Sequence, residues 1–206
     1  MIRPKRPVII GLTGSIGMGK SAVAKMFEDE GVPVFDADAA VHRIQGPGGA
    51  LLPQIEAAFP GSTGSQGVDR VKLGTMVLHD KDQLAKLESI IHPAVAAERA
   101  VFLEAHAQDD LVVFDIPLLF EKGGAKNVDV IVVVSAPADI QRARVLARTG
   151  MTESKFENIL KLQMPDEEKR ARADHVIDTG TSLVQTGANI EKLVRYLRSP
   201  LAHRDK

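Results

Sequence analysis

The feature that most constrains this chain is a glycine-rich segment between an apolar run and a helical pattern. Residues 14–21 read GSIGMGKS, which fits the spacing G-x-x-x-x-G-K-[ST]. The apolar run 8–12 precedes this segment, and the helical pattern 21–29 follows it. A strand, a glycine-rich turn and a helix in this order form a phosphate-binding loop, or P-loop. We therefore expect the chain to bind nucleotide phosphates at the end of its first strand.

Each residue type in this loop has a chemical reason. Glycines let successive backbone N–H groups point at phosphate oxygens, and the helix start adds the positive end of its dipole. Lys20 is expected near the β- and γ-phosphates, and the Ser21 hydroxyl is expected to ligate Mg²⁺. The residues predicted to contact the nucleotide here are Gly17, Met18, Gly19, Lys20, Ser21 and Ala22.

Four further apolar runs predict the rest of a sheet. They cover residues 32–35, 111–116, 128–134 and, more weakly, 175–177. The longer runs are almost continuously apolar, which is typical of parallel strands that helices cover on both faces. We therefore predict an α/β fold, a doubly wound parallel sheet of about five strands of the P-loop NTPase type.

One block, residues 39–108, interrupts this alternation with helical periodicity and no convincing strand. Its polar segment 60–67, PGSTGSQG, is predicted to be a loop. The spacing of a buried helix face is followed by Leu84, Leu87, Ile90 and Ile91. His92-Pro93 is expected to kink or end that helix. We interpret the block as a helical insertion between the second and third strands.

The end of the chain predicts a helix that packs on the sheet. An apolar stripe with i, i+3, i+4, i+7 spacing is formed by Ile190, Leu193, Val194 and Leu197. These patterns divide the chain into a nucleotide-binding core (1–38, 109–140 and 174–198), the insertion (39–108), a helical lid (141–173) and a tail (199–206).

Composition excludes several function classes. The 206 residues include no cysteine, which excludes disulfides, zinc–thiolate sites and iron–sulfur clusters. The 26 basic and 27 acidic residues give a net charge of −1, whereas nucleic-acid or anionic-membrane binding normally brings a basic excess. The apolar run after the basic start is too short for a signal segment or a membrane span. We expect a cytoplasmic protein with no nucleic-acid or membrane partner.

Carboxylates follow two of the predicted strands, where ligands bind in doubly wound folds. Asp36 and Asp38 end the second run, and either can deprotonate an attacking hydroxyl, although Asp36 can instead cap the next helix. We favour Asp38 as the base. Asp115 ends the third run and matches the acid that holds a metal in P-loop proteins. The apolar loop 116–121 is predicted to form a substrate wall or to pack under the insertion.

Basic residues follow the fourth predicted strand. Gln141, Arg144 and Arg148 have the spacing of one helix face. Small P-loop kinases use arginines from a lid to neutralise the charge of the transferred phosphoryl group. A solvated helix face would show the same charge run, but we favour a lid, because the position after the fourth strand is where a lid would start.

Taken in order, these segments resemble the dephospho-CoA kinase family over about residues 8–198. The similar segments are GLTGSIGMGKS (11–21), VPVFDADAAV (32–41), VDRVKLGTMV (68–77), His92-Pro93, FDIPLLFE (114–121), Gln163 and ADHVID (173–178). Many families share the P-loop, whereas DAD, DR, HP and PLLFE in this order are specific to this one. Thr179 departs from the family, which usually has Asn there.

The resemblance implies transfer of the ATP γ-phosphate to the ribose 3′-hydroxyl of dephospho-CoA with Mg²⁺. It implies that Asp38 is the base, that Lys20 and Arg148 hold the phosphates, and that Ser21 and Asp115 hold the metal. The residues implied around the acceptor are Asp38, Arg70, His92, Pro93, Leu118, Leu119 and Glu121. Those implied at ATP beyond the P-loop are Arg144, Ile177 and Thr179, the last two near the adenine. The insertion would bind the CoA moiety.

Other function classes fit less of the sequence. A nucleoside or nucleotide kinase would share the P-loop and the lid but lack the DAD, HP and PLLFE segments. A GTPase switch needs D-x-x-G and N-K-x-D, and neither occurs in the chain. An ATP-dependent remodeller is usually larger and oligomeric. We expect ATP and dephospho-CoA as partners, and a monomer or small homo-oligomer.

Overall fold

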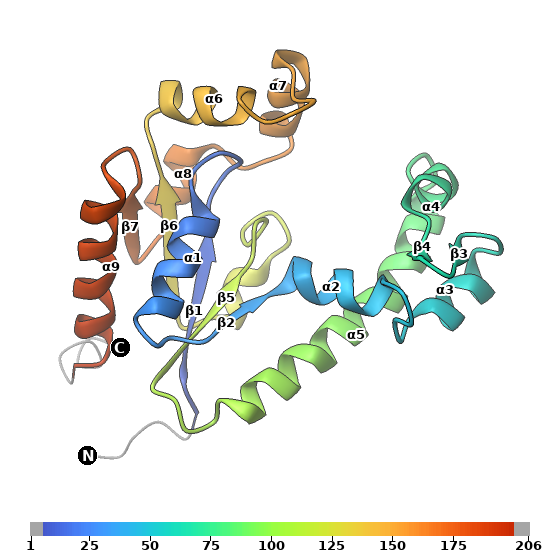
Figure 1. Cartoon of the computed structure of the whole chain (residues 1–206), viewed down its shortest axis with the longest axis horizontal. Coiled ribbons are helices and arrows are strands. Elements are labelled where there is room, and N and C mark those ends of the chain that lie inside the picture. The colour runs from blue at the N-terminus through green and yellow to red at the C-terminus, as the bar shows by residue number, and fades with distance from the viewer. Residues whose placement is uncertain (1–5, 200–206) are drawn as a thin grey trace. The chain divides into compact units, whose positions relative to one another are not determined.

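The computed structural model describes residues 6–199 (Figure 1), and the chain divides into two units. The first unit takes residues up to Phe35 and from His106 onward, and the second is Asp36–Ala105. The second unit begins three residues before the predicted insertion 39–108 and ends three residues before its end. The predicted tail 199–206 lies outside the described residues except for Ser199.

The first unit is built on a five-stranded sheet with the strand order β2-β5-β1-β6-β7. The strands are β1 (Val8–Thr13), β2 (Val34–Asp36), β5 (Leu111–Asp115), β6 (Val130–Ser135) and β7 (His175–Asp178). β1 pairs in parallel with β5 and with β6, and β6 pairs in parallel with β7. The predicted parallel α/β sheet is confirmed, and each predicted strand is present.

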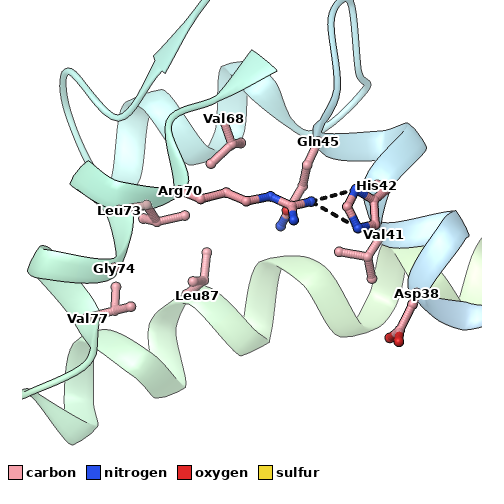
Figure 2. Close-up of a pocket in the computed structure, with 10 residues that line it drawn as sticks. All are labelled: Asp38, Val41, His42, Gln45, Val68, Arg70, Leu73, Gly74, Val77 and Leu87. Carbon is pink, nitrogen blue, oxygen red and sulfur yellow. Dashed lines mark hydrogen bonds between the residues drawn. The ribbon is translucent and has the colours of Figure 1, made fainter. Parts of the chain in front are cut away.

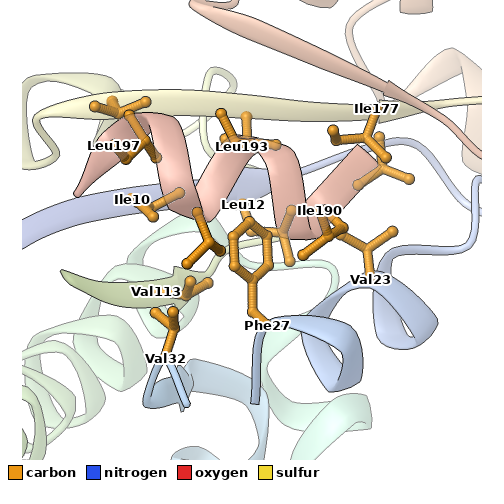
Figure 3. Packing of buried hydrophobic residues seen from close by; sticks show 14 of the residues in the cluster. Ile10, Leu12, Val23, Phe27, Val32, Val113, Ile177, Ile190, Leu193 and Leu197 are labelled. Atoms are coloured by element: carbon orange, nitrogen blue, oxygen red, sulfur yellow. The ribbon is translucent and has the colours of Figure 1, made fainter. Parts of the chain in front are cut away.

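Helices connect the strands of this sheet or follow its last strand. They are α1 (Lys20–Asp29), the 3₁₀ helix η1 (Gly124–Asn127), α6 (Ala138–Leu146), α7 (Glu153–Lys161), α8 (Asp166–Ala171) and α9 (Leu183–Leu197). Figure 3 shows the apolar core, in which Phe27 of α1 and Ile190 of α9 meet Leu12 of β1. The predicted C-terminal stripe is confirmed, because all four of its side chains are at most 7% exposed.

The second unit consists of short helices, a small hairpin and one long helix. Its elements are α2 (Ala37–Gln45), α3 (Leu52–Ala58), β3 (Thr63–Gly64), β4 (Gly67–Val68), α4 (Arg70–Val77) and α5 (Lys81–Ala105). A separate apolar cluster holds them together and includes Ile44, Ile55, Phe59, Leu73 and Leu87. The unit thus has its own core.

Three local predictions for this block are wrong. Segment 60–67 is not only a loop, because β3 and β4 pair in antiparallel there, and Glu56 accepts hydrogen bonds from Thr63 N (3.1 Å) and Thr63 Oγ1 (2.6 Å). Of the two alternatives predicted at His92-Pro93, an end of the helix is wrong, because α5 continues through Pro93, whereas a kink there stays a prediction. Leu84 is 39% exposed, so the buried face of α5 begins at Leu87.

Tertiary packing explains why α5 continues through Pro93. Apolar side chains on both sides of Pro93, namely Leu87, Ile90, Ile91, Ala94 and Val95, belong to the same cluster. Pro93 itself is exposed. Burial of apolar side chains on both sides of Pro93 therefore outweighs the local cost of the proline.

Candidate active site

The P-loop lies between β1 and α1, as the sequence predicts. Gly17 and Gly19 have positive φ angles of 79° and 84°, a conformation that residues with a Cβ rarely adopt. A Cβ at Gly17 would also lie 2.4 Å from Val145 Cγ2. Both positions therefore need glycine, and Gly19 directly precedes the first helical residue, Lys20. The exposed Ser21 and Ala22 lie in the first turn of α1.

Lys20, the first residue of α1, forms an ion pair with Asp115, the last residue of β5. Their side chains are 17% and 7% exposed, so both charges are largely removed from water. A buried carboxylate is costly without a cation, and Lys20 supplies that cation. The structure thus brings together the residue predicted to contact the phosphates and the residue predicted to hold the metal.

Two glutamines hold the P-loop backbone from the region predicted as a lid. Gln141 of α6 donates from Nε2 to the Ile16 carbonyl at 2.7 Å. Gln163, which follows α7, accepts from the Ile16 N–H at 3.0 Å. Both backbone groups of one loop residue are therefore satisfied by side chains more than 100 positions away. The sequence named both glutamines but assigned no such role to either.

Thr179, just beyond β7, connects the P-loop with α6. Its hydroxyl donates to the Met18 carbonyl at 2.7 Å, and the side chain is buried. Arg144 donates to the Thr179 carbonyl at 2.7 Å. Gln141 and Arg144 therefore both face the P-loop region, as the predicted helix face requires. Arg148 does not belong to that face, because α6 ends at Leu146.

The two aspartates after β2 have different surroundings. Asp36 is the N-cap of α2, and its Oδ1 accepts from the Ala39 N–H at 2.9 Å. Asp38 is exposed in the first turn of α2, and within residues 6–199 no hydrogen bond or ion pair engages its carboxylate. The capping role that the sequence left open for Asp36 is thus present, and Asp38 retains a carboxylate available for chemistry.

A cavity of about 380 Å³ lies within the second unit (Figure 2). Its lining residues are Asp38, Val41, His42, Gln45, Val68, Arg70, Leu73, Gly74, Val77 and Leu87. Arg70 Nη2 donates to His42 Nδ1 at 2.7 Å. Asp69 caps the helix that Arg70 begins, and the backbone N–H of Lys72, with help from that of Val71, lowers the pKa of Asp69.

Other residues predicted at the acceptor lie outside this cavity. His92 and Pro93 are exposed on α5. In the first unit, Leu118 is half-buried, whereas Leu119 is 0% exposed. Direct ligand contact by the Leu119 side chain, as predicted, is therefore wrong for this conformation, because that side chain lies in the core. Ile177 is likewise buried in the core, at 5% exposure, so its side chain does not face a nucleotide.

Glu121 has structural partners that the sequence did not indicate. Its Oε1 accepts from the Met164 N–H at 2.8 Å and lies 2.8 Å from Lys169 Nζ. Burial acts to raise the pKa of Glu121, but Lys169 and the Met164 N–H outweigh it, so the pKa lies below its ordinary value. The carboxylate thus links the loop after β5 to the segment before α8.

The residues at the P-loop have the ligand chemistry that Mg²⁺ prefers. The Ser21 hydroxyl and the Asp115 carboxylate are hard oxygen ligands. No group of three or more His, Cys, Asp or Glu side chains suited to a metal occurs in the part of the chain that the structure describes. This is the donor set expected where nucleotide phosphates and water supply the other ligands.

Comparisons with known proteins identify the family. Residues 8–185 match the family described as dephospho-CoA kinase. The dephospho-CoA kinase of Novosphingobium aromaticivorans is 63% identical over 193 residues, which cover 94% of this chain and 96% of that protein. The chain belongs to the dephospho-CoA kinase family. The family prediction is confirmed, and with it the prediction of a phosphotransferase.

Solved structures agree with this family assignment at the level of the fold. A Thermus thermophilus protein is 34% identical with a TM-score of 0.82, and the match covers 95% of this chain and 100% of that one. The dephospho-CoA kinase of Campylobacter jejuni has a TM-score of 0.61 at 22% identity, covering 92% of this chain and 96% of its own. At that identity the second likeness shows the fold alone. Among residues 6–199, no helix has the length and apolar character needed to cross a membrane.

Proposed function

We propose that this member of the dephospho-CoA kinase family transfers the γ-phosphoryl group of ATP to the ribose 3′-hydroxyl of dephospho-CoA, yielding coenzyme A and ADP. The observation that carries the proposal is the Lys20–Asp115 pair at a P-loop within a family match over residues 8–185. The P-loop supports ATP as the phosphoryl donor, and the family match supports the acceptor.

The P-loop side of the reaction rests on backbone donors and cations. The N–H groups of residues 17–22 bind phosphate oxygens at the start of α1. Lys20 stabilises the charge on the transferred group, and Arg144 and Arg148 add positive charge nearby. Near the adenine, Ile177 and Thr179 contribute backbone atoms and not side chains, since both side chains are buried.

Ser21 and Asp115 would hold Mg²⁺, which when bound neutralises phosphate charge during transfer. Their oxygens fit that ion. The Asp115 carboxylate is largely buried, and its ion pair with Lys20 holds it in place. An ammonium group has three donors, so Lys20 can serve both the carboxylate and a phosphate.

The acceptor side rests on Asp38 and on the 380 Å³ cavity of the second unit, which we call the acceptor pocket. Asp38 takes the proton from the attacking hydroxyl, a role its unengaged carboxylate supports. Arg70 binds an anionic part of the acceptor at the same cavity, and the exposed His92 and Pro93 contact its outer part. Leu118 contributes to the acceptor wall, while Leu119 and Glu121 keep its loop in place.

The experiment is an ADP-release assay with Mg-ATP, run alone, with dephospho-CoA, and with a panel of nucleosides and nucleotides. Release that requires dephospho-CoA, together with a product of coenzyme A mass, is the expected result. Release with a nucleoside instead contradicts the proposed acceptor but keeps the chemistry. Gel filtration tests the prediction that the protein is a monomer or a small homo-oligomer. The cytoplasmic location stays a prediction.

A further inference from the structure

Lys169 is the one charged side chain among residues 6–199 that has no exposed surface, at 0%. It belongs to α8, a short helix whose neighbouring residues in sequence are mostly charged and exposed. Its ammonium lies 2.8 Å from Glu121 Oε1. An apolar residue of similar volume is often at least as stabilising in a buried place, so packing alone does not account for a lysine here.

The Lys169–Glu121 pair is connected to the P-loop by two consecutive residues, Gln163 and Met164. Glu121 Oε1, held by Lys169, also accepts from the Met164 N–H at 2.8 Å. The preceding residue, Gln163, accepts from the Ile16 N–H at 3.0 Å. A carboxylate fixed on one side by a buried cation thus fixes the peptide segment that places the Gln163 side chain against the loop.

We propose that Lys169 is a positioning residue for the P-loop, acting through Glu121, Met164 and Gln163. The cation holds the Glu121 carboxylate through the 2.8 Å ion pair with Oε1, and within the described residues Glu121 Oε2 and Lys169 Nζ are both buried without a hydrogen-bond partner, so neither charge has water to replace the other. That carboxylate holds the backbone at 163–164, and the P-loop keeps the conformation in which its N–H groups meet phosphate. Lys169 itself contacts neither substrate.

The test compares Lys169→Met with the matched control Lys192→Met, an exposed lysine on α9. Lys169→Met is expected to raise the KM for ATP about tenfold and to weaken ATP binding by calorimetry to the same extent. The KM for dephospho-CoA is expected to change less than about threefold. Lys192→Met is expected to leave all three unchanged. Rates are measured below the melting temperature of each variant.

A cycle with Gln163→Ala separates positioning from general stability. If Lys169 acts through Gln163, the double variant raises the KM for ATP no more than the stronger single variant does. Multiplied effects overturn the proposal, and so does a lowered melting temperature with unchanged ATP binding. If Lys169→Met does not fold, the variant that combines it with Glu121→Gln removes both charges of the pair. This double variant is expected to show the same rise in the KM for ATP. Normal ATP binding by the double variant overturns the proposal.

The kinetic readout rests on the proposed phosphoryl transfer, whereas the calorimetric one does not. Wild-type protein that binds ATP but does not phosphorylate dephospho-CoA would end the proposed function. The effect of Lys169→Met on ATP binding would still decide the positioning role.

Discussion

The phosphate-binding region and the acceptor pocket are built in opposite ways. In the first, Lys20, Asp115 and Thr179 are largely buried, and each has a named partner. In the second, Asp38 and Arg70 are exposed on short helices, and the partner of Arg70, His42, is itself exposed. Side-chain hydrogen bonds and an ion pair connect the elements of the first region, whereas the polar side chains of the second are exposed.

The chemistry of the two ligands proposed for these regions accounts for this difference. A phosphate chain is the same in every turnover, and preorganised donors bind its developing charge without reorganising during the reaction. An acceptor with a long apolar and polar body needs a cavity that side chains can adjust to. Buried charges need partners to exist at all, so the phosphate-binding region is also where single substitutions have the largest effects.

Lys20→Ala is expected to have the largest effect. It removes the cation that meets phosphate and the ion pair of Lys20 with the buried Asp115, so kcat/KM should fall about 10³-fold or more. The matched control is Lys25→Ala, an exposed lysine on the same helix, which should retain activity within about twofold. Steady-state kinetics with ATP decide between them. Full activity in Lys20→Ala would contradict the P-loop assignment.

Asp38→Asn is expected to be next, although its side chain is exposed. Without the base, kcat should fall about 10²–10⁴-fold while ATP binding by calorimetry stays unchanged. Asp36→Asn is a close control, because asparagine caps a helix as well as aspartate does. If Asp36→Asn loses turnover and Asp38→Asn keeps it, Asp36 is the base and the two aspartates exchange roles.

Arg70→Ala tests whether the open pocket binds the acceptor. The KM for dephospho-CoA should rise about tenfold, because a hydrogen bond between charged groups is lost, with the KM for ATP unchanged. Lys81→Ala, at the exposed start of α5, serves as a control and should change neither constant. A rise in the KM for ATP alone would mean that Arg70 belongs to the nucleotide and not to the acceptor.

Thr179→Val tests whether a buried hydrogen bond in the phosphate-binding region stabilises the fold. The valine keeps the shape but removes the hydroxyl that donates to the Met18 carbonyl, so the free energy of unfolding should fall by about 1–2 kcal/mol. The KM for ATP should rise a few-fold. Urea unfolding measures the first effect, with the exposed Thr149→Val as control. Equal stability of the two variants would show that this bond contributes little.

Glu121 gives the smallest expected effect, a pH dependence of stability. Its pKa is lower in the folded protein than in the unfolded chain, so its contribution is present above the unfolded value of about 4.3 and is lost as the pH falls through the folded pKa. The wild type should therefore lose more melting temperature than Glu121→Gln between about pH 5 and pH 3. Parallel curves, with the exposed Glu157→Gln as reference, would contradict this linkage.

Most of the fold and the position of the P-loop could be predicted because their signals are local. A continuous apolar run indicates a buried strand wherever the rest of the chain goes, and the G-x-x-x-x-G-K-S spacing demands one loop conformation. Predicted strands, the first helix and the C-terminal stripe on α9 all follow from such patterns. The order of DAD, DR, HP and PLLFE segments added the family.

The tertiary structure decided what depends on distant partners. Pro93 stays inside α5 because apolar contacts on both sides of it outweigh a local rule. Lys169 lies in the charged run DEEKRAR, which by itself indicates a solvated helix, and its burial depends on a glutamate 48 positions earlier. Leu119 lies in an apolar loop that fits a ligand wall or a core equally well, and only its packing distinguishes the two. Sequence periodicity depends only on residues that are near one another in the chain. An ion pair between distant residues forms only when the fold brings those residues together, so the sequence alone does not indicate it.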